Sequence, residues 1–196
     1  MLFTLQELVD LVVMTLAIGY IFSTFVRREP TEGYDPITYY KKNTLFEDIK
    51  FGAMIAAPAI VLHELMHKFA AMAFGAVAVL HAPDLMGIPY GWYILVIVMR
   101  LLNFPLLFFI GGYVAHSALP PLQSAFVAAA GPLTNLVLFL VFSALVKYRI
   151  VNKKFYKTLG IMAKLNLFLF GFNLIPLPGF DGFSLFAGLL KFLGIF

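Results

Sequence analysis

His63 and His67 are the side chains in this sequence whose spacing most directly indicates metal chemistry. On a helix, residues i and i+4 lie on one face, one turn apart, so both imidazoles can bind the same ion. Glu64 lies one step round the helix, where its carboxylate can take a proton from a metal-bound water. The pattern His-Glu-x-x-His therefore predicts two zinc ligands and a general base.

The surrounding composition gives these ionisable groups more weight. The chain has 196 residues, of which 62% are hydrophobic and only 12% are charged, whereas soluble domains carry roughly 25% charged residues. The sequence thus predicts an integral membrane protein. Ionisable side chains are costly in hydrocarbon and usually functional there. Hydrogen-bonded structural histidines are the alternative, but they would leave two histidines and a glutamate in the membrane without a role.

A third ligand is expected, because a catalytic zinc usually has three protein ligands and one open position. Of the ten acidic residues, two lie near the start of the first apolar segment and six lie in connections, which leaves Glu64 inside an apolar segment and Asp181 between the last two. Asp181 follows a Pro- and Gly-containing stretch at 176–179, and broken helices are tolerated in membranes where they line a cavity. We therefore predict Asp181 as the third ligand. His81 and His116, in connections bounded by Pro and Gly, are less favoured candidates.

The apolar segments that position these residues predict an all-α polytopic membrane protein, a bundle of about five to six transmembrane helices. They cover residues 5–26, 51–75, 92–110, 122–146, 159–178 and 182–196. A spanning helix needs roughly 20 residues. The last segment allows only a short tilted helix or an interfacial one, and segment 92–110 either crosses the membrane or dips into it and returns. We predict one domain, residues 1–196, in the cell membrane and crossing it several times.

The charged residues indicate which partners to expect. The sequence lacks the basic, aromatic-interleaved patch of nucleic-acid binders, so the expected partners are the lipid bilayer and transmembrane proteins, and not nucleic acid. Lysines and arginines, including those of the basic stretch 147–158, are expected to mark topology and contact headgroups. Lys68, next to His67, is expected to snorkel away from the metal, with its ammonium group reaching water. The absence of cysteine excludes thiolate ligands.

Three motifs resemble those of the site-2 protease family of intramembrane zinc metalloproteases. They are HELMH at 63–67, AGPLTN at 130–135 and NLIPLPGFDG at 173–182, in the order that the family shows. GGYV at 111–114 looks like the short extended or re-entrant segment that the family places between the helix with His-Glu-x-x-His and the helix with Ala-Gly-Pro. The resemblance covers residues 51–190.

The resemblance implies one zinc ion on the three ligands named above, with Glu64 as the catalytic base. It also implies that Asn135 and Asn173 donate hydrogen bonds to the substrate or to the oxyanion. A helix–helix hydrogen bond is the alternative for Asn135, and capping of a broken helix is the alternative for Asn173. Gly111 and Gly112 would let a substrate strand approach the backbone closely, with a simple turn as their alternative.

The predicted activity is zinc-dependent hydrolysis of peptide bonds within or near the transmembrane helices of membrane-protein substrates. A non-hydrolytic metal-binding protein or a metal transporter would use the same ligands, but it leaves Glu64 without a role. A metallopeptidase acting on prenylated C-termini is expected to use a distant glutamate as its third ligand. The acid that follows His67 in an apolar context is Asp181, which argues against this class. An aspartyl intramembrane protease would need two membrane aspartates, and the sequence offers one convincing candidate.

Overall fold

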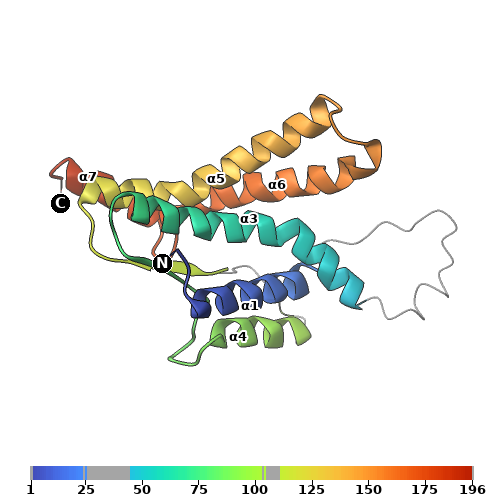
Figure 1. Ribbon diagram of the computed structural model, residues 1–196, viewed down its shortest axis with the longest axis horizontal. Coiled ribbons are helices and arrows are strands. Elements are labelled where there is room, and N and C mark those ends of the chain that lie inside the picture. Colours follow the sequence, from blue (N-terminus) through green and yellow to red (C-terminus); the bar gives the residue numbers. More distant parts are fainter. Residues whose placement is uncertain (1, 24, 26–44, 103, 105–110, 196) are drawn as a thin grey trace, which may run out of the picture.

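The computed structural model of the chain describes residues 2–23, 25, 45–102, 104 and 111–195. In this part of the chain, six α-helices accompany a two-stranded sheet (Figure 1). The elements are α1 (Leu5–Phe22), α3 (Leu45–Ala73), β1 (Ala78–His81), α4 (Gly91–Leu101), β2 (Tyr113–His116), α5 (Pro121–Lys147), the short 3-10 helix η1 (Lys153–Phe155), α6 (Tyr156–Asn173) and α7 (Asp181–Phe192).

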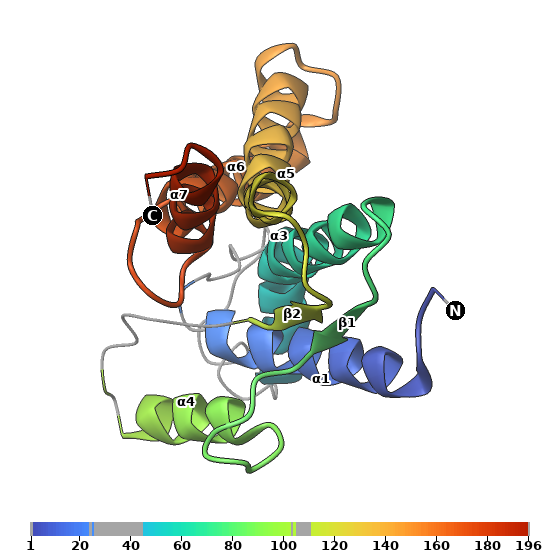
Figure 2. The ribbon, with the colours of Figure 1, turned by 90° about the vertical axis from the view of Figure 1, so that its left-hand side faces the viewer.

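Helix α3 lies at the centre of the molecule. It packs against α1 and both strands as well as against α5 and α6, and Figure 2 shows α1 and α4 on one side of it and α5, α6 and α7 on the other. Its buried face is rich in small residues, among them Ala56, Ala57, Ala59 and Ala71. Small side chains let neighbouring helices approach closely. The histidines of α3 can therefore be contacted from several elements at once.

The helix lengths support fewer membrane-spanning helices than the sequence predicted. Within the described residues, two helices are long and apolar enough to cross a membrane, α1 with 18 residues and α5 with 27. Helices α4 and α7 have 11 and 12 residues, which is too short for a hydrocarbon core of about 30 Å at roughly 1.5 Å per residue. The mostly helical architecture is confirmed, but the described part of the chain contains two candidate spans where five to six were predicted for the whole.

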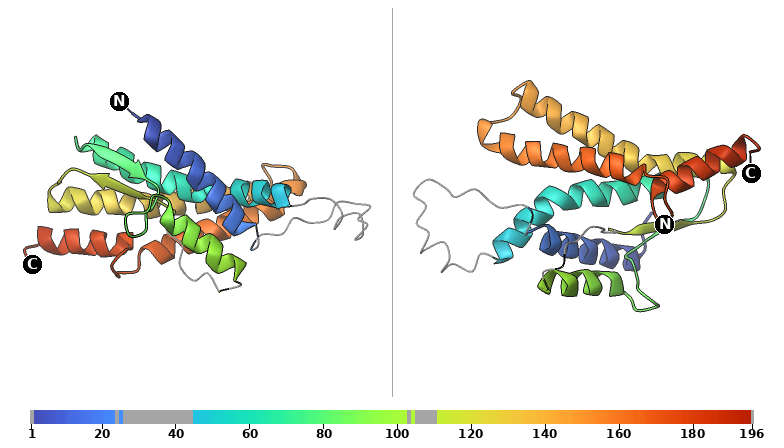
Figure 3. Two further views of the ribbon diagram at one scale, coloured as in Figure 1. Left: turned by 90° about the horizontal axis from the view of Figure 1, so that it is seen from below. Right: turned by 180° about the vertical axis from the view of Figure 1, so that it is seen from behind.

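The two short helices lie along longer ones. Figure 3 shows α4 beside α1 and α7 beside α5, and both pairs are in contact. Of the predicted segment 92–110, the helical part ends at Leu101, while residues 103 and 105–110 lie outside the described residues. Segment 182–196 forms most of α7, the short helix that its length allowed.

The expected extended segment between α3 and α5 is one strand of an antiparallel sheet. In the register of β1 and β2, Ala78 is opposite His116 and Leu80 is opposite Val114. The N–H of Ser117 donates to the carbonyl of Val77, directly opposite, at 2.9 Å. Because hydrogen-bonded pairs alternate along an antiparallel ladder, the N–H and C=O groups of Val114 and His116 point away from β1. Strand β2 therefore has an outward edge.

Candidate metal centre

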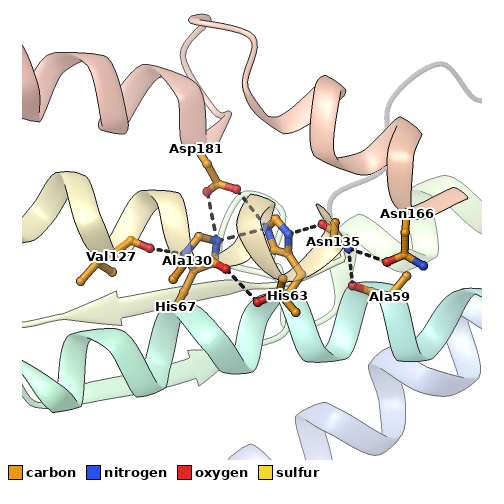
Figure 4. Close-up of polar contacts among 9 residues, drawn as sticks. Ala59, His63, His67, Val127, Ala130, Asn135, Asn166 and Asp181 are labelled. Carbon is orange, nitrogen blue, oxygen red and sulfur yellow. Dashed lines mark hydrogen bonds and ion pairs between the residues drawn. The ribbon is translucent and has the colours of Figure 1, made fainter. Parts of the chain in front are cut away.

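The three side chains predicted as metal ligands meet in one place (Figure 4). His63 Nε2 lies 3.0 Å from Asp181 Oδ2, and His67 Nε2 lies 3.2 Å from Asp181 Oδ1. The two Nε2 atoms are 3.1 Å apart. Both histidines are buried, and Asp181 is partly buried. The histidines come from successive turns of α3, and the aspartate is the first residue of α7.

Helix α5 holds both imidazoles by their other nitrogen. His63 Nδ1 lies 2.7 Å from Asn135 Oδ1, and His67 Nδ1 lies 2.7 Å from the carbonyl oxygen of Val127. Both oxygens accept hydrogen bonds, so each Nδ1 carries the proton and donates it. Each Nε2 is then left with a free lone pair directed at the other ligands. Partners of this kind fix the tautomer and orientation of metal-binding histidines.

This arrangement fits a zinc ion. Two imidazole lone pairs and a carboxylate face one another, and one ligand atom from each residue lies within 4.8 Å of the others. Without a cation, atoms that all accept hydrogen bonds would repel one another at such distances, and Asp181 Oδ2 has no hydrogen-bond donor in the described structure. Two histidines and one carboxylate form a donor set that catalytic zinc sites use, with a fourth position for water.

Gly131 of α5 leaves space for the ion. A Cβ atom built at this position would lie 2.7 Å from His63 Cε1 and closer still to both Nε2 atoms. Any larger residue would therefore occupy the place toward which the lone pairs point. This contact gives a physical reason for glycine in the Ala-Gly-Pro motif of α5.

We expect Gly131→Ala to weaken zinc binding by at least about 100-fold, since loss of an outer contact to a ligand already weakens binding by 10- to 100-fold. Zinc affinity would be measured by competition with a chelator. Gly160→Ala is the matched control, because Gly160 lies in α6 with no atom within 4 Å of its added Cβ. Equal zinc affinity of the two variants would contradict this assignment of Gly131.

The connection from α6 to α7 brings Asp181 to the histidines. Helix α6 ends at Asn173 and α7 begins at Asp181. A Cβ atom at Gly182 would lie 2.7 Å from the carbonyl oxygen of Ile175 and closer to that of Leu174. The start of α7 therefore packs directly on the preceding turn, and the Asp-Gly pair combines a ligand with the residue that permits this close contact.

Asn135 lies behind His63 and does not line the cavity described next. Its side chain is fully buried, and its Nδ2 donates to the carbonyl of Ala59 and to Asn166 Oδ1, both at 3.0 Å. Asn166 in turn donates to the carbonyl of Met162 at 2.8 Å. These contacts match the helix–helix alternative for Asn135. Asn166 was missed in the sequence, although it is a polar residue in the apolar segment 159–178.

A cavity of about 940 Å³ opens onto the three ligands. Glu64, which is 8% exposed, lines it. Gly111 and Gly112 form part of its wall at the start of β2, and a Cβ atom at Gly112 would lie 3.5 Å from Glu64 Cγ. Asn173 also lines this cavity. Four of the residues predicted to take part in catalysis or substrate binding therefore face the same space.

The two other histidines lie outside the ligand cluster. His81 stacks on Tyr113, with 5.3 Å between the ring centroids. His116 lines the cavity, but its Nδ1 lies 2.9 Å from the carbonyl of Ser117. Among the described residues, the group of potential metal ligands consists of His63, His67 and Asp181.

The expectation that the Lys68 ammonium group reaches water was wrong. The side chain is 2% exposed, and its ammonium group forms an ion pair with Glu7, which is 1% exposed. Lys68 lies on the face of α3 that packs against α1, where Glu7 meets it. Glu7 and Asp10 were not predicted to be buried acids. They lie near the start of α1, and the sequence does not show that β1 and the residue after it pack over them.

Comparison with known proteins agrees with this geometry. No family model and no solved structure matches the chain. The chain is 31% identical over 186 residues to a protein of Methanocaldococcus jannaschii named "Putative zinc metalloprotease MJ0611", covering 92% of this chain and 83% of that protein. With this identity and coverage, the chain belongs to the same family as that protein.

Proposed function

We propose that this protein is an intramembrane zinc metalloprotease of the site-2 protease type, which hydrolyses peptide bonds within or near transmembrane helices of membrane proteins. One observation carries the proposal. His63, His67 and Asp181 converge in a cavity that also contains Glu64 and an outward strand edge. A metal-storage or transport role would need the three ligands but neither the base nor the strand.

The outer surface of the helices supports a location in the membrane. Eight large apolar side chains on α1 and α5 are 46 to 59% exposed. They are Leu8, Val12 and Leu16 on α1 and Phe126, Leu133, Val137, Leu140 and Val141 on α5. Soluble monomers rarely expose so much contiguous apolar surface, which marks contact with a membrane or another protein. We infer a multi-pass protein whose substrates reach the site from the bilayer.

In this mechanism, the protein side chains hold the reactants and move the protons. Zinc bound at the site would polarise the scissile carbonyl and lower the pKa of a coordinated water. His63, His67 and Asp181 hold the ion. Glu64 accepts the proton of the attacking water and delivers it to the leaving amine.

The outward edge of β2 can bind an unwound segment of substrate. The N–H and C=O groups of Val114 and His116 point away from β1, and both residues line the cavity. A peptide in a helix has its backbone hydrogen bonds occupied, so a scissile segment must unwind and find new partners. Strand addition to β2 would provide them. Gly112 would admit the substrate close to Glu64.

The two predicted helper asparagines take different roles in this proposal. Asn173 ends α6 and lines the cavity, so its amide is available to donate to substrate. Asn135 has both N–H groups occupied and acts through His63, whose ring it orients. Asn135 is therefore a positioning residue for a metal ligand.

A cleavage assay in proteoliposomes tests the proposal. Purified protein would be incubated with a panel of single-span substrates, with zinc present, removed by chelation and restored. We expect zinc-dependent products whose masses locate the broken bond within or near the span. Cleavage restricted to soluble segments would contradict the intramembrane site. Zinc uptake into the vesicles without cleavage would favour a transporter.

A further inference from the structure

A buried ion pair lies on the opposite side of the sheet from the cavity edge. Glu7 of α1 and Lys68 of α3 are 1% and 2% exposed, and the Lys68 ammonium group contacts Glu7 Oε1. The ring of Phe3 covers the same ammonium group, with its centroid 4.6 Å away. Lys68 directly follows the metal ligand His67 in α3, so the pair connects α1 to the metal-binding helix.

The same oxygen of Glu7 also holds the sheet. Glu7 Oε1 accepts a hydrogen bond of 2.8 Å from the N–H of Leu80 in β1. Leu80 is opposite Val114 of β2 in the register of the sheet. One carboxylate oxygen therefore links the helix that carries the metal ligands to the strand pair whose outer edge lines the cavity. No contact of Glu7 reaches the reacting groups themselves.

Asp10 lies one turn further along α1. Its carboxylate accepts a hydrogen bond from the next N–H group that points away from β2, which belongs to Ala82, just after β1. Its Oδ2 accepts from the N–H of Ala82 at 3.3 Å, and its Oδ1 accepts from Tyr90 Oη at 2.9 Å. The hydrogen bond to Asp10 raises the pKa of Tyr90 above its usual value. The two carboxylates of α1 thereby cover the outer edge of β1, and the edge of β2 is left to receive a partner strand.

Stability alone is a weak explanation for the Glu7–Lys68 pair. A buried ion pair replaced by apolar residues of similar volume often leaves stability unchanged or improves it, because desolvation offsets the attraction between the charges. An apolar pair would pack α1 on α3 equally well. It would not accept a hydrogen bond from Leu80, and the sheet would then have no polar contact with the metal-binding helix at this point.

We propose that Glu7 and Lys68 are positioning residues that hold the β2 edge in one register relative to the metal, so that a single bond of the substrate is presented for cleavage. The proposal rests on the proposed function, since it assigns a precision to that cleavage. A substrate strand keeps the same faces when it slips by two residues. When the sheet is fixed relative to α3, one register of the substrate strand along β2 places a peptide bond beside the metal ligands, and a strand shifted by two residues places a different bond there.

The test compares wild type with the double variant Glu7→Leu/Lys68→Met, which removes both links without leaving a charge unpaired. Cleavage positions on one single-span substrate would be mapped by mass spectrometry. We expect cleavage at the original bond to fall about tenfold or more, because small misplacements at a site are costly, and a second product displaced by two residues to appear. Zinc affinity should stay within about threefold of wild type, since no metal ligand or its Nδ1 partner is changed.

One variant serves as the control. Ile18→Ala removes buried packing between α1 and α3 but leaves the Glu7 contacts in place, and it should cleave the original bond alone. A purely structural role of the pair would instead lower yield in every variant without changing the bond that is cut.

Hydrogen exchange on the zinc-loaded samples separates this proposal from the proposed function. We expect exchange in residues 78–81 and 113–116 to accelerate about tenfold or more in the double variant, because local opening follows loss of local contacts. If wild type cleaved no substrate, the proposed function would fail, and the exchange result alone would decide the positioning role. Unchanged exchange, or a single unshifted product from the double variant, would overturn the proposal. Loss of zinc by that variant would also overturn the proposal, since the pair would then support the metal ligands themselves.

Discussion

Glu64→Gln is expected to bind zinc as wild type does and to lose cleavage by a factor on the order of 10²- to 10⁴-fold, the range contributed by a general acid–base group. Glu64 lines the cavity but is not part of the ligand cluster. Glutamine preserves the shape of the side chain and removes its ability to accept the proton of the attacking water. Zinc content and the initial rate of substrate cleavage, measured on the same preparation, would separate metal binding from metal use.

The same substitution at Glu47 provides the control for Glu64→Gln. Glu47 lies in the first turn of α3, far along the same helix, and its side chain is 51% exposed. Glu47→Gln should cleave substrate at the wild-type rate. If Glu64→Gln cleaved equally well, the site would not be hydrolytic in the way proposed, and a metal-binding or transport role would gain support.

Asp181→Asn is expected to weaken zinc binding by on the order of 100-fold or more and to abolish cleavage at limiting zinc, because it removes the charged ligand of the set. The asparagine keeps the size of the side chain and its place at the start of α7. It presents one neutral oxygen and an amide group to imidazole lone pairs that lie 3.0 and 3.2 Å from the carboxylate oxygens. Zinc affinity would be measured by chelator competition and cleavage by zinc titration.

Asp48→Asn is the matched change at a remote acidic residue in the first turn of α3. It should leave zinc affinity and cleavage unchanged. Retention of wild-type zinc affinity by Asp181→Asn would exclude Asp181 as a ligand. Partial recovery of cleavage by Asp181→Asn at high zinc would agree with the account, since the base and the strand edge are intact in that variant.

The metal ligands could be located from the sequence because they are marked either by their spacing along one helix or by an ionisable residue in an apolar context. The spacing of His63 and His67 is set by one turn of α3. Asp181 could be found because acidic residues are scarce in the apolar segments. The contacts that complete the site are long-range and carry no such signal. Asn135 meets His63 across 72 positions of sequence, and Gly131 reveals its role only where α5 crosses the imidazoles.

Helix topology was harder to predict because hydrophobicity does not distinguish a helix that crosses lipid from one that packs along another helix. Segments 92–110 and 182–196 are apolar in sequence, yet their helices α4 and α7 are short and lie against α1 and α5. The prediction for Lys68 failed for a related reason. A lysine beside an apolar face is expected at an interface, and only the fold shows that Glu7 lies opposite it.

X-ray absorption at the zinc edge tests the central claim most directly, because it reports which atoms bind the ion. For purified protein loaded with one equivalent of zinc, we predict two imidazole nitrogens at about 2.0–2.1 Å and carboxylate or water oxygens at about 2.0–2.2 Å. The His63→Ala/His67→Ala variant should lose the imidazole signal. Zinc bound without histidine, or an unchanged spectrum from this variant, would contradict a site built from His63, His67 and Asp181.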